Sequence, residues 1–98
     1  MAVHVVIPSQ FVAEAGGNDA VEVNGATVRE ALDHLIAQHP DLGERLFADG
    51  RLKRFINLYV DDEDIRLLND LDTELDDGAE LTILPAIAGG RRMRGVTS

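Results

Sequence analysis

The alternation of apolar and polar positions in the first 24 residues predicts two strands. Residues 3–7 form a β-branched run that ends at Pro8. Residues 20–24 alternate apolar and polar side chains, which places Val21 and Val23 on one face. Residues 14–19 between them have the glycine, asparagine and aspartate content of a turn. We therefore expect an antiparallel hairpin whose loop is longer than the commonest hairpin loops.

A single amphipathic helix is predicted after this hairpin. Thr27 and Glu30 have the spacing of a capping box, in which each side chain accepts a hydrogen bond from the other residue's main-chain N–H. Apolar residues follow at helical spacing, and Pro40 marks the end of the pattern. Because one helix has to cover the sheet, this stripe is expected in the core and not in a partner-binding groove. The stripe comprises Val28, Ala31, Leu32, Leu35 and Ile36, and a further short helical turn is predicted at Leu42, Leu46 and Phe47.

Three more strands are predicted in the second half of the chain. Residues 55–60 are apolar on both faces except at Asn57, which predicts a central strand. The acidic residues 61–64 are expected to turn the chain, residues 65–67 to form the return strand, and residues 80–84 to form the last strand. The spacing of three leucines predicts a helical turn at Leu68, Leu71 and Leu75.

The resulting order is strand, strand, helix, strand, strand, strand. It predicts an α+β fold in which one main helix covers one face of a mixed sheet. This is the order of the β-grasp, or ubiquitin-like, fold. We expect residues 1–84 to form that domain, residues 85–90 to form an extended stem ending in Gly-Gly, and residues 91–98 to form a removable tail.

Composition narrows the function classes. Ninety-eight residues suit one domain, and the absence of cysteine excludes a disulfide framework, cysteine-ligated zinc, an iron–sulfur centre and a thiol nucleophile. A net charge of −9 speaks against binding to nucleic acid or an anionic membrane, because phosphate contacts need clustered basic residues. No apolar run is long enough to span a membrane, and the N-terminus lacks the basic region of a signal peptide. We therefore expect a cytoplasmic protein.

Charge is distributed unevenly along the chain. Arg91, Arg92 and Arg94 lie in the last eight residues, so residues 1–90 hold six basic and eighteen acidic side chains, a balance of −12. Three cations are too few for a nucleic-acid site. The change in composition marks the tail as distinct from the acidic body.

No candidate catalytic or metal-binding side chain emerges from the sequence. The acidic residues 61–64 lack the spaced ligands, central glycine and distal glutamate of a calcium loop. No helix opens after residues 16–17 with the spacing of a phosphate loop. The histidines show no metal-ligand spacing, and the hydroxyl residues have no triad partners; these are His4, His34, His39, Ser9, Thr27 and Thr73. We predict a protein that is not an enzyme and binds no metal.

Two stretches resemble a known family. Residues 55–66 are similar to the strand–turn–strand signature of the MoaD/ThiS sulfur-carrier family, and residues 77–90 are similar to its final strand and Gly-Gly end. The ending, with Pro85, Ala86 and Ala88 before Gly89 and Gly90, looks most like that of CysO-type members.

The resemblance implies a chemistry carried by the main chain. An adenylating and sulfurtransferase enzyme of the ubiquitin-activating type would use ATP and magnesium to convert the Gly90 carboxylate to an acyl-adenylate, and a persulfide would then displace AMP to leave a thiocarboxylate. The carrier itself would bind no cofactor. The stem would enter the partner's active site, because six extended residues reach roughly 20 Å and glycine has no side chain to obstruct a narrow channel. The stem residues are Pro85, Ala86, Ile87, Ala88 and Gly89.

The sequence departs from the simple family pattern because Gly90 is followed by eight more residues. An amide at Gly90 cannot be adenylated as a carboxylate can. The resemblance implies that a JAMM-type zinc metalloprotease cuts between Gly90 and Arg91. The other interpretations are that the chain is not a sulfur carrier, and that the tail was added by cloning.

Three functions remain open at this stage. The first is a sulfur carrier, with a pyridoxal-phosphate-dependent, cysteine-synthase-type acceptor favoured and acceptors for molybdopterin, thiamine or other thio-metabolites open. The second is a ubiquitin-like modifier joined through Gly90 to lysines, and the third is a non-catalytic interaction module that keeps its tail. An apolar patch on the sheet face away from the helix, for docking the adenylating enzyme, is expected from some of Leu58, Val60, Leu81 and Ile83.

Overall fold

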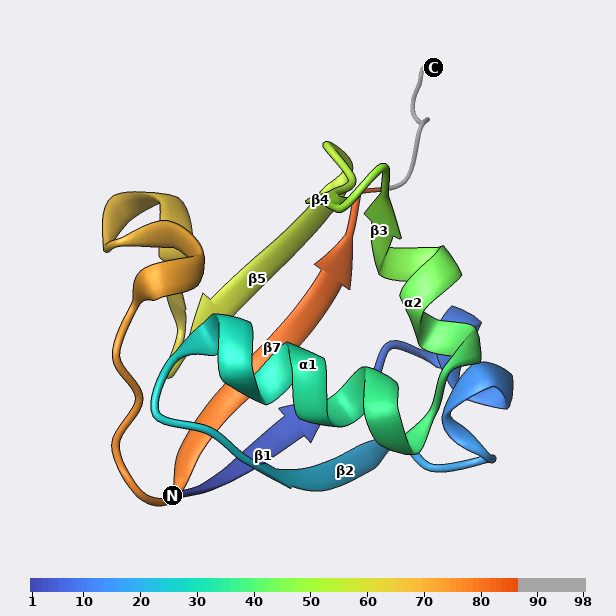
Figure 1. Cartoon of the computed structure of the whole chain (residues 1–98), viewed down its shortest axis with the longest axis horizontal. Helices are drawn as coiled ribbons and strands as arrows, with labels where there is room; N and C mark the ends of the chain where they lie inside the picture. The colour runs from blue at the N-terminus through green and yellow to red at the C-terminus, as the bar shows by residue number, and fades with distance from the viewer. Residues whose placement is uncertain (87–98) are drawn as a thin grey trace.

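The chain folds into a five-stranded mixed sheet with one main helix across one face (Figure 1). The computed structural model describes residues 1–86. The strands lie in the order β2-β1-β7-β5-β6, with β1 and β7 parallel and the other neighbours antiparallel. This confirms the predicted α+β, β-grasp architecture. The strands are β1 (Ala2–Val6), β2 (Ala20–Asn24), β5 (Ile56–Val60), β6 (Glu63–Asp64) and β7 (Ala79–Pro85).

The N-terminal hairpin is present as predicted, with Val3 opposite Val23 and Val5 opposite Val21. Its loop is more structured than the turn expected from composition. Two 3₁₀ turns, η1 (Ser9–Phe11) and η2 (Ala13–Ala15), fold back against the core, and Phe11 and Ala15 are buried there. The long loop therefore contributes apolar side chains as well as a connection.

Helix α1 (Val28–Gln38) begins at the predicted cap. Thr27 Oγ accepts a hydrogen bond from the Glu30 N–H at 3.2 Å. The Glu30 carboxylate, however, accepts from the Ala26 N–H at 2.9 Å and not from that of Thr27. The apolar stripe packs on the sheet as expected, with Ile36 half-buried at its edge.

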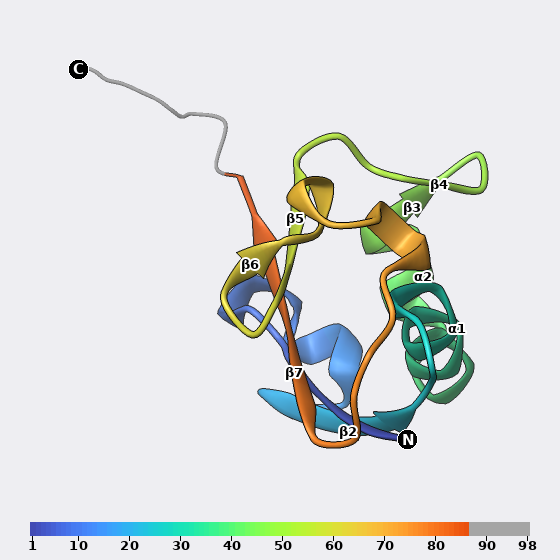
Figure 2. The ribbon, with the colours of Figure 1, turned by 90° about the vertical axis from the view of Figure 1, so that its left-hand side faces the viewer.

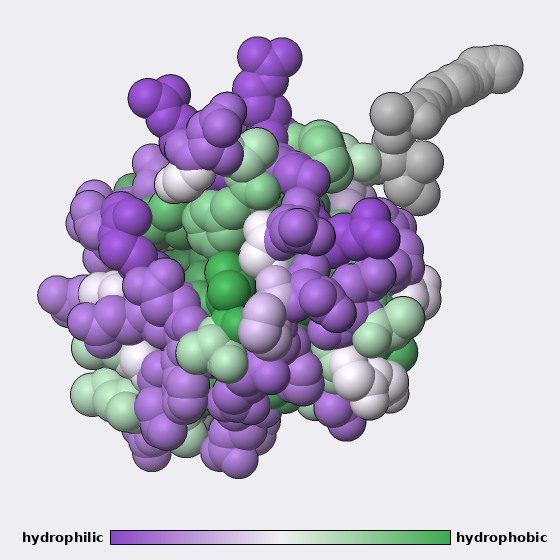
Figure 3. Space-filling model, turned by 45° about the vertical axis from the view of Figure 1, so that its right-hand side comes forward, coloured by the Kyte–Doolittle hydropathy of each residue, from purple (hydrophilic) through white to green (hydrophobic). Residues whose placement is uncertain are grey.

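The chain between α1 and β5 contains a short helix and a hairpin. Helix α2 (Asp41–Leu46) buries Leu42 and Leu46, as predicted. It leads into a small hairpin of β3 (Phe47–Ala48) and β4 (Arg51–Leu52), so Phe47 lies on a strand and not on the predicted helical turn. Figure 3 shows polar residues around an apolar hollow on this side of the molecule. A hollow of about 410 Å³ there is lined by Ile36 and Phe47 among others.

The segment after β5 differs from the prediction. Residues 65–67 were predicted to form the return strand but form a 3₁₀ turn, η3 (Ile65–Leu67). The return strand is β6 (Glu63–Asp64), which lies within the predicted turn at residues 61–64. The turn itself is confined to Asp61 and Asp62, whose φ angles of 47° and 75° suit a two-residue hairpin turn with left-handed backbone. Asp64 then caps η3 by accepting from the Arg66 N–H at 2.9 Å. This cap starts a helical turn where a strand was expected.

Two further expectations need correction. The helical turn predicted at Leu68, Leu71 and Leu75 is shorter than expected. It is the 3₁₀ turn η4 (Asp70–Asp72), which contains Leu71 but neither Leu68 nor Leu75. The central strand is β7, whereas β5 lies fourth in the sheet. Strand β5 buries Ile56 and Leu58 on the face toward the core, whereas Phe55 is 48% exposed and Asn57 and Tyr59 are half-buried, so its apolar sequence does not reflect burial on both faces.

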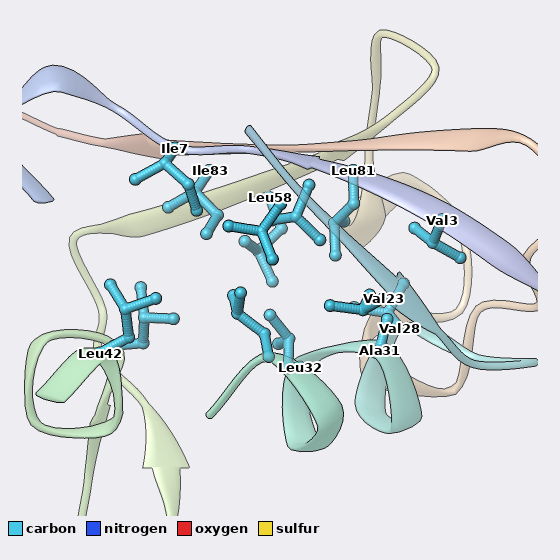
Figure 4. Packing of buried hydrophobic residues seen from close by; sticks show 14 of the residues in the cluster. Val3, Ile7, Val23, Val28, Ala31, Leu32, Leu42, Leu58, Leu81 and Ile83 are labelled. Carbon is cyan, nitrogen blue, oxygen red and sulfur yellow. The ribbon is translucent and has the colours of Figure 1, made fainter. Parts of the chain in front are cut away.

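The core lies between the sheet and α1 (Figure 4). Leu58, Leu81 and Ile83 point from the sheet toward Leu32 and its neighbours on the helix, and each is 1% exposed or less. Val60 is half-buried against the same core. The apolar docking patch expected from these strand residues is therefore wrong, because their strand phase directs them inward.

Candidate functional site

The candidate site begins at the C-terminal end of β7. Pro85 lies opposite Ile56 as the last residue of the strand, and the next N–H, that of Ala86, donates to the Phe55 carbonyl oxygen at 2.6 Å. The strand is thus one residue longer at each end than predicted, and its main chain stays attached to β5 through Ala86. Ile87, Ala88, Gly89, Gly90 and Arg91 lie outside the described residues, so the predicted stem, cleavage point and domain division stay predictions.

Proline is compatible with this place in the sheet. In an antiparallel pair, successive residues direct their main-chain N–H and C=O groups alternately toward and away from the partner strand. Since Ala86 donates to Phe55, the main-chain groups of Pro85 point away from β5, toward the side of β1. Strand β1 pairs with β7 only as far as Thr82. No ladder hydrogen bond is lost at Pro85, which meets the usual condition for proline in a strand.

Exposed apolar and cationic side chains surround this end of β7. Phe55 is 48% exposed and Leu84 is 47% exposed. The Lys53 Nζ lies 5.8 Å from the centre of the Phe55 ring, within the range of a cation–π contact. Figure 1 shows β4 and the end of β7 at the same end of the molecule.

Sequence reasoning did not identify Phe55 and Lys53 as neighbours of the stem. They precede β5, some thirty positions before Pro85, and only the register of β5 against β7 brings them together. The one available signal was the strand–turn–strand resemblance, which says nothing of register. The site's surroundings were therefore accessible only from tertiary structure.

The strongest electrostatic contact within the described residues is the pair formed by Asp64 and Arg66. The Arg66 Nη2 lies 2.7 Å from Asp64 Oδ2, and its Nε donates to Oδ1 at 3.1 Å. Hydrogen bonds from the Arg66 side chain, and then from its main-chain N–H, lower the pKa of the Asp64 carboxyl from its ordinary value of 3.8. This pair holds η3 against β6 and offers no poised acid or base.

Within residues 1–86 no group of three or more histidine, cysteine or acidic side chains is arranged to hold a metal ion. His34 has a structural contact, since its Nδ1 accepts a hydrogen bond from the Asn24 N–H at 2.8 Å and ties α1 to β2. No helix in this part of the chain is long and apolar enough to cross a membrane.

Comparisons with known proteins find relatives over nearly the whole chain. The family model described as the ThiS family matches residues 5–90. The sulfur carrier protein CysO of Mycobacterium tuberculosis is 41% identical over 93 residues, which cover 92% of this chain and all of that protein.

Two solved structures are similar over nearly the whole chain. The crystal structure of the Amycolatopsis orientalis BexX/CysO complex contains a chain that is 46% identical, with a TM-score of 0.83, and covers 90% of this chain and 99% of that one. The structure of SAMP1 from Haloferax volcanii is 31% identical with a TM-score of 0.80 and covers 92% and 100%. A family match over residues 5–90, joined to the β-grasp arrangement of the strands, shows that the chain belongs to the ThiS family.

Proposed function

We propose that this protein is a sulfur carrier whose working group is the main-chain carboxylate of Gly90. The observation that carries the proposal is the extent of the family match, which runs to residue 90 and ends at the second glycine. The structure supports it by ending β7 five residues before that point, with Ala86 exposed at the edge of the body. A carboxylate on such a stem can enter a partner while the folded domain stays outside.

The proposed chemistry needs no catalytic side chain from this chain. Partner-bound ATP and magnesium would activate the Gly90 carboxylate as an acyl-adenylate with release of pyrophosphate. A partner persulfide would attack the acyl carbon and displace AMP, and reductive cleavage of the resulting sulfur–sulfur bond by a thiol would leave the thiocarboxylate. Gly89 and Gly90 suit this route because a residue without Cβ passes a narrow channel and adopts backbone conformations closed to other residues.

Activation would first require removal of residues 91–98. A JAMM-type zinc protease would add a metal-activated water to the Gly90 carbonyl carbon, break the bond to Arg91 nitrogen and release the octapeptide. The free carboxylate of Gly90 would then be the substrate of adenylation. Cleavage would also remove three positive charges, so the formal balance would change from −9 to −12.

The similarity to CysO favours a cysteine-synthase-type, pyridoxal-phosphate-dependent enzyme as the sulfur acceptor. A second acceptor class remains open because the Amycolatopsis orientalis CysO forms a complex with BexX. In both cases the carrier would deliver sulfur through the stem, and the acceptor would be chosen by surfaces of the folded body.

The deciding experiment compares full-length protein with protein that ends at Gly90. Each is incubated with the adenylating enzyme, ATP and a sulfur donor, and intact mass is measured. We expect only the short form to gain about 16 Da, the difference between sulfur and oxygen. The full-length form should gain it only after a metalloprotease has removed the tail.

A Gly89→Val variant of the short form is the matched test of the steric argument. It should fold normally but should not support ATP–pyrophosphate exchange. Sulfur transfer by protein that still carries Ser98, measured by mass, would contradict the precursor proposal.

A second candidate function has a specific observation in its favour. Small archaeal modifier protein 3 of Haloferax volcanii is 35% identical over 65 residues, which cover 66% of this chain. If this protein were a modifier, Gly90 would form isopeptide bonds with lysines. Protein-sized mass increases on other proteins in the native cell, in place of the small gain of sulfur, would favour that function.

A further inference from the structure

Three of the cations in residues 1–86 lie close together in the sequence. Arg51, Lys53 and Arg54 are half of the six basic side chains of this part of the chain, which also holds eighteen acidic ones. Each of the other three cations forms an ion pair, whereas no salt bridge within the described residues involves Arg51, Lys53 or Arg54. No acidic residue occurs between positions 51 and 60. This segment therefore carries uncompensated positive charge on an acidic protein.

Hydrogen bonds hold the main chain of this segment in place. The Lys53 N–H donates to the Leu46 oxygen at 2.8 Å, which ties the segment to the end of α2. The Ile56 N–H donates to the Lys53 oxygen at 3.0 Å and closes a turn with Arg54 and Phe55 at its centre. Both central residues are exposed. Side chains on a turn that is already ordered lose less conformational freedom on binding than side chains on a free loop.

A hollow of about 520 Å³ lies beside this turn and is called here the cationic hollow. The three cations line it, and Asp49, the nearest acidic residue in the sequence, is not part of the lining. Figure 2 shows the chain between β4 and β5 crossing the top of the molecule, from the β3–β4 hairpin toward the sheet. The apolar side chains of the lining are Ala48, Leu52 and Phe55. The hollow thus combines positive charge with apolar surface.

The cationic hollow adjoins the root of the stem. Phe55 lines the hollow, and its carbonyl oxygen accepts the hydrogen bond from the Ala86 N–H at 2.6 Å. Gly90 lies four residues beyond Ala86, a reach of at most roughly 14 Å along an extended chain. A partner that takes Gly90 into a buried active site must therefore bring the surface around its entrance close to the hollow.

We propose that the adenylating enzyme docks on the cationic hollow through acidic side chains around the entrance to its active site. This docking rests on the proposed activation of Gly90 and names the surface by which the enzyme would hold the carrier. Its carboxylates would contact the three cations, and one of its apolar side chains would cover Phe55. Salt screens charges more than about 8 Å apart at physiological ionic strength, so the local charge of the hollow outweighs the opposite charge of the distant body.

Two other occupants suit the hollow less well. Residues 91–98 carry three arginines, and hence the same charge as the hollow. Nucleic acid would gain little there, because three cations neutralise few phosphates and Phe55 is the one aromatic side chain in the lining for a base to stack on. An acidic protein surface with an apolar side chain matches both the charge and the lining.

The test measures ATP–pyrophosphate exchange by the adenylating enzyme with protein that ends at Gly90. The K53Q/R54Q variant should raise the KM for the carrier by about fivefold or more and leave kcat within about twofold, because these side chains lie away from the reacting carboxylate. The Q10E/Q38E variant is the matched control, since it lowers the formal charge by the same amount at two exposed residues outside the hollow. Its KM should change by less than about twofold.

Amide spectra that overlay on those of the full-length chain would show that each form folds. Added salt should raise the KM of the parent more steeply than that of K53Q/R54Q, because the variant has fewer charged contacts to lose. An unchanged KM in K53Q/R54Q, or an equal rise in both variants, would overturn the docking proposal while leaving Gly90 as the activated group. Absence of exchange by the parent would contradict the proposed function, and the docking with it. Binding of a single-stranded oligonucleotide that K53Q/R54Q abolishes would overturn the proposal in favour of nucleic acid.

Discussion

Helix α1 and the segment that joins β6 to β7, residues 65–78, are held in place in different ways. The helix makes its own hydrogen bonds, has a cap at Thr27 and buries one apolar stripe. The segment contains only two 3₁₀ turns, and its main chain bonds to residues far away in the sequence. The Leu75 N–H donates to the Ala26 oxygen at 2.8 Å, and the Gly78 N–H to the Ala2 oxygen at 2.7 Å. The conformation of α1 therefore depends mainly on residues nearby in the sequence. That of residues 65–78 depends also on hydrogen bonds to residues far away in the sequence.

The largest expected effect contrasts one leucine from each region. Leu35→Ala removes a fully buried side chain of α1 and should lower the free energy of unfolding by about 2–5 kcal/mol, the range for cavity-forming truncations. Leu67→Ala truncates a side chain of η3 that is 82% exposed. It should change the free energy of unfolding by no more than about 0.5 kcal/mol. Urea denaturation measures both. Equal losses would show that the segment, too, is held by side-chain burial.

A smaller effect is expected where α1 begins. A Cβ on Gly25 would lie 2.6 Å from the Ala31 nitrogen and 2.9 Å from its Cα, and main-chain atoms of a helix cannot move aside cheaply. Gly25→Ala should therefore lower the free energy of unfolding by about 1–3 kcal/mol. Gly43→Ala in α2 is the control, because its Cβ would meet only the Ile36 side chain, at 3.3 Å. Thermal unfolding of the two variants should differ, and a melting temperature unchanged by Gly25→Ala would refute the steric argument.

Two threonines offer the next comparison. Thr27→Ala removes the cap of α1 and should lower the free energy of unfolding by about 0.5–2 kcal/mol, with a loss of helical circular dichroism near the transition. Thr73→Val keeps the shape of a buried side chain but removes the hydroxyl that accepts from the Asn69 N–H at 3.0 Å. This loss should lower the free energy of unfolding by about 0.5–1.5 kcal/mol. A loss of helical signal in Thr73→Val as well would show that the segment supports the helix.

The smallest effect concerns the pH dependence of stability at Asp64. Because Arg66 lowers the pKa of this carboxyl in the folded protein, the carboxylate stabilises the fold above the ordinary value of 3.8, and that contribution is lost as the pH falls below it. Asp64→Asn retains an acceptor for the Arg66 N–H but lacks the charge. The variant should be slightly less stable than the parent at pH 7, and the difference should vanish by about pH 2. A difference that stays constant across this range would show that the charge has no part in it.

The same contrast explains which features of the site could be predicted. A stem that ends in Gly-Gly could be predicted from a linear motif, because its proposed chemistry belongs to the main chain and needs no neighbour, and it stays a prediction. The place of Phe55 and Lys53 beside the end of β7 could not be predicted, because it depends on the register of β5 against β7. Residues 65–67 had the composition of a strand but form a 3₁₀ turn, because of a local signal, the cap at Asp64, that the pattern of apolar residues does not contain.

The sequence by itself determined the elements whose signals are local. These are the N-terminal hairpin, the cap and stripe of α1, the strands around residues 56–60 and 79–85, and hence the β-grasp order. Only the tertiary structure decided that β7 is central and that Phe55 and Lys53 lie beside the end of β7. The physical reason is that strand order and register are settled by burial and hydrogen bonding between residues far apart in the chain, which no local pattern encodes.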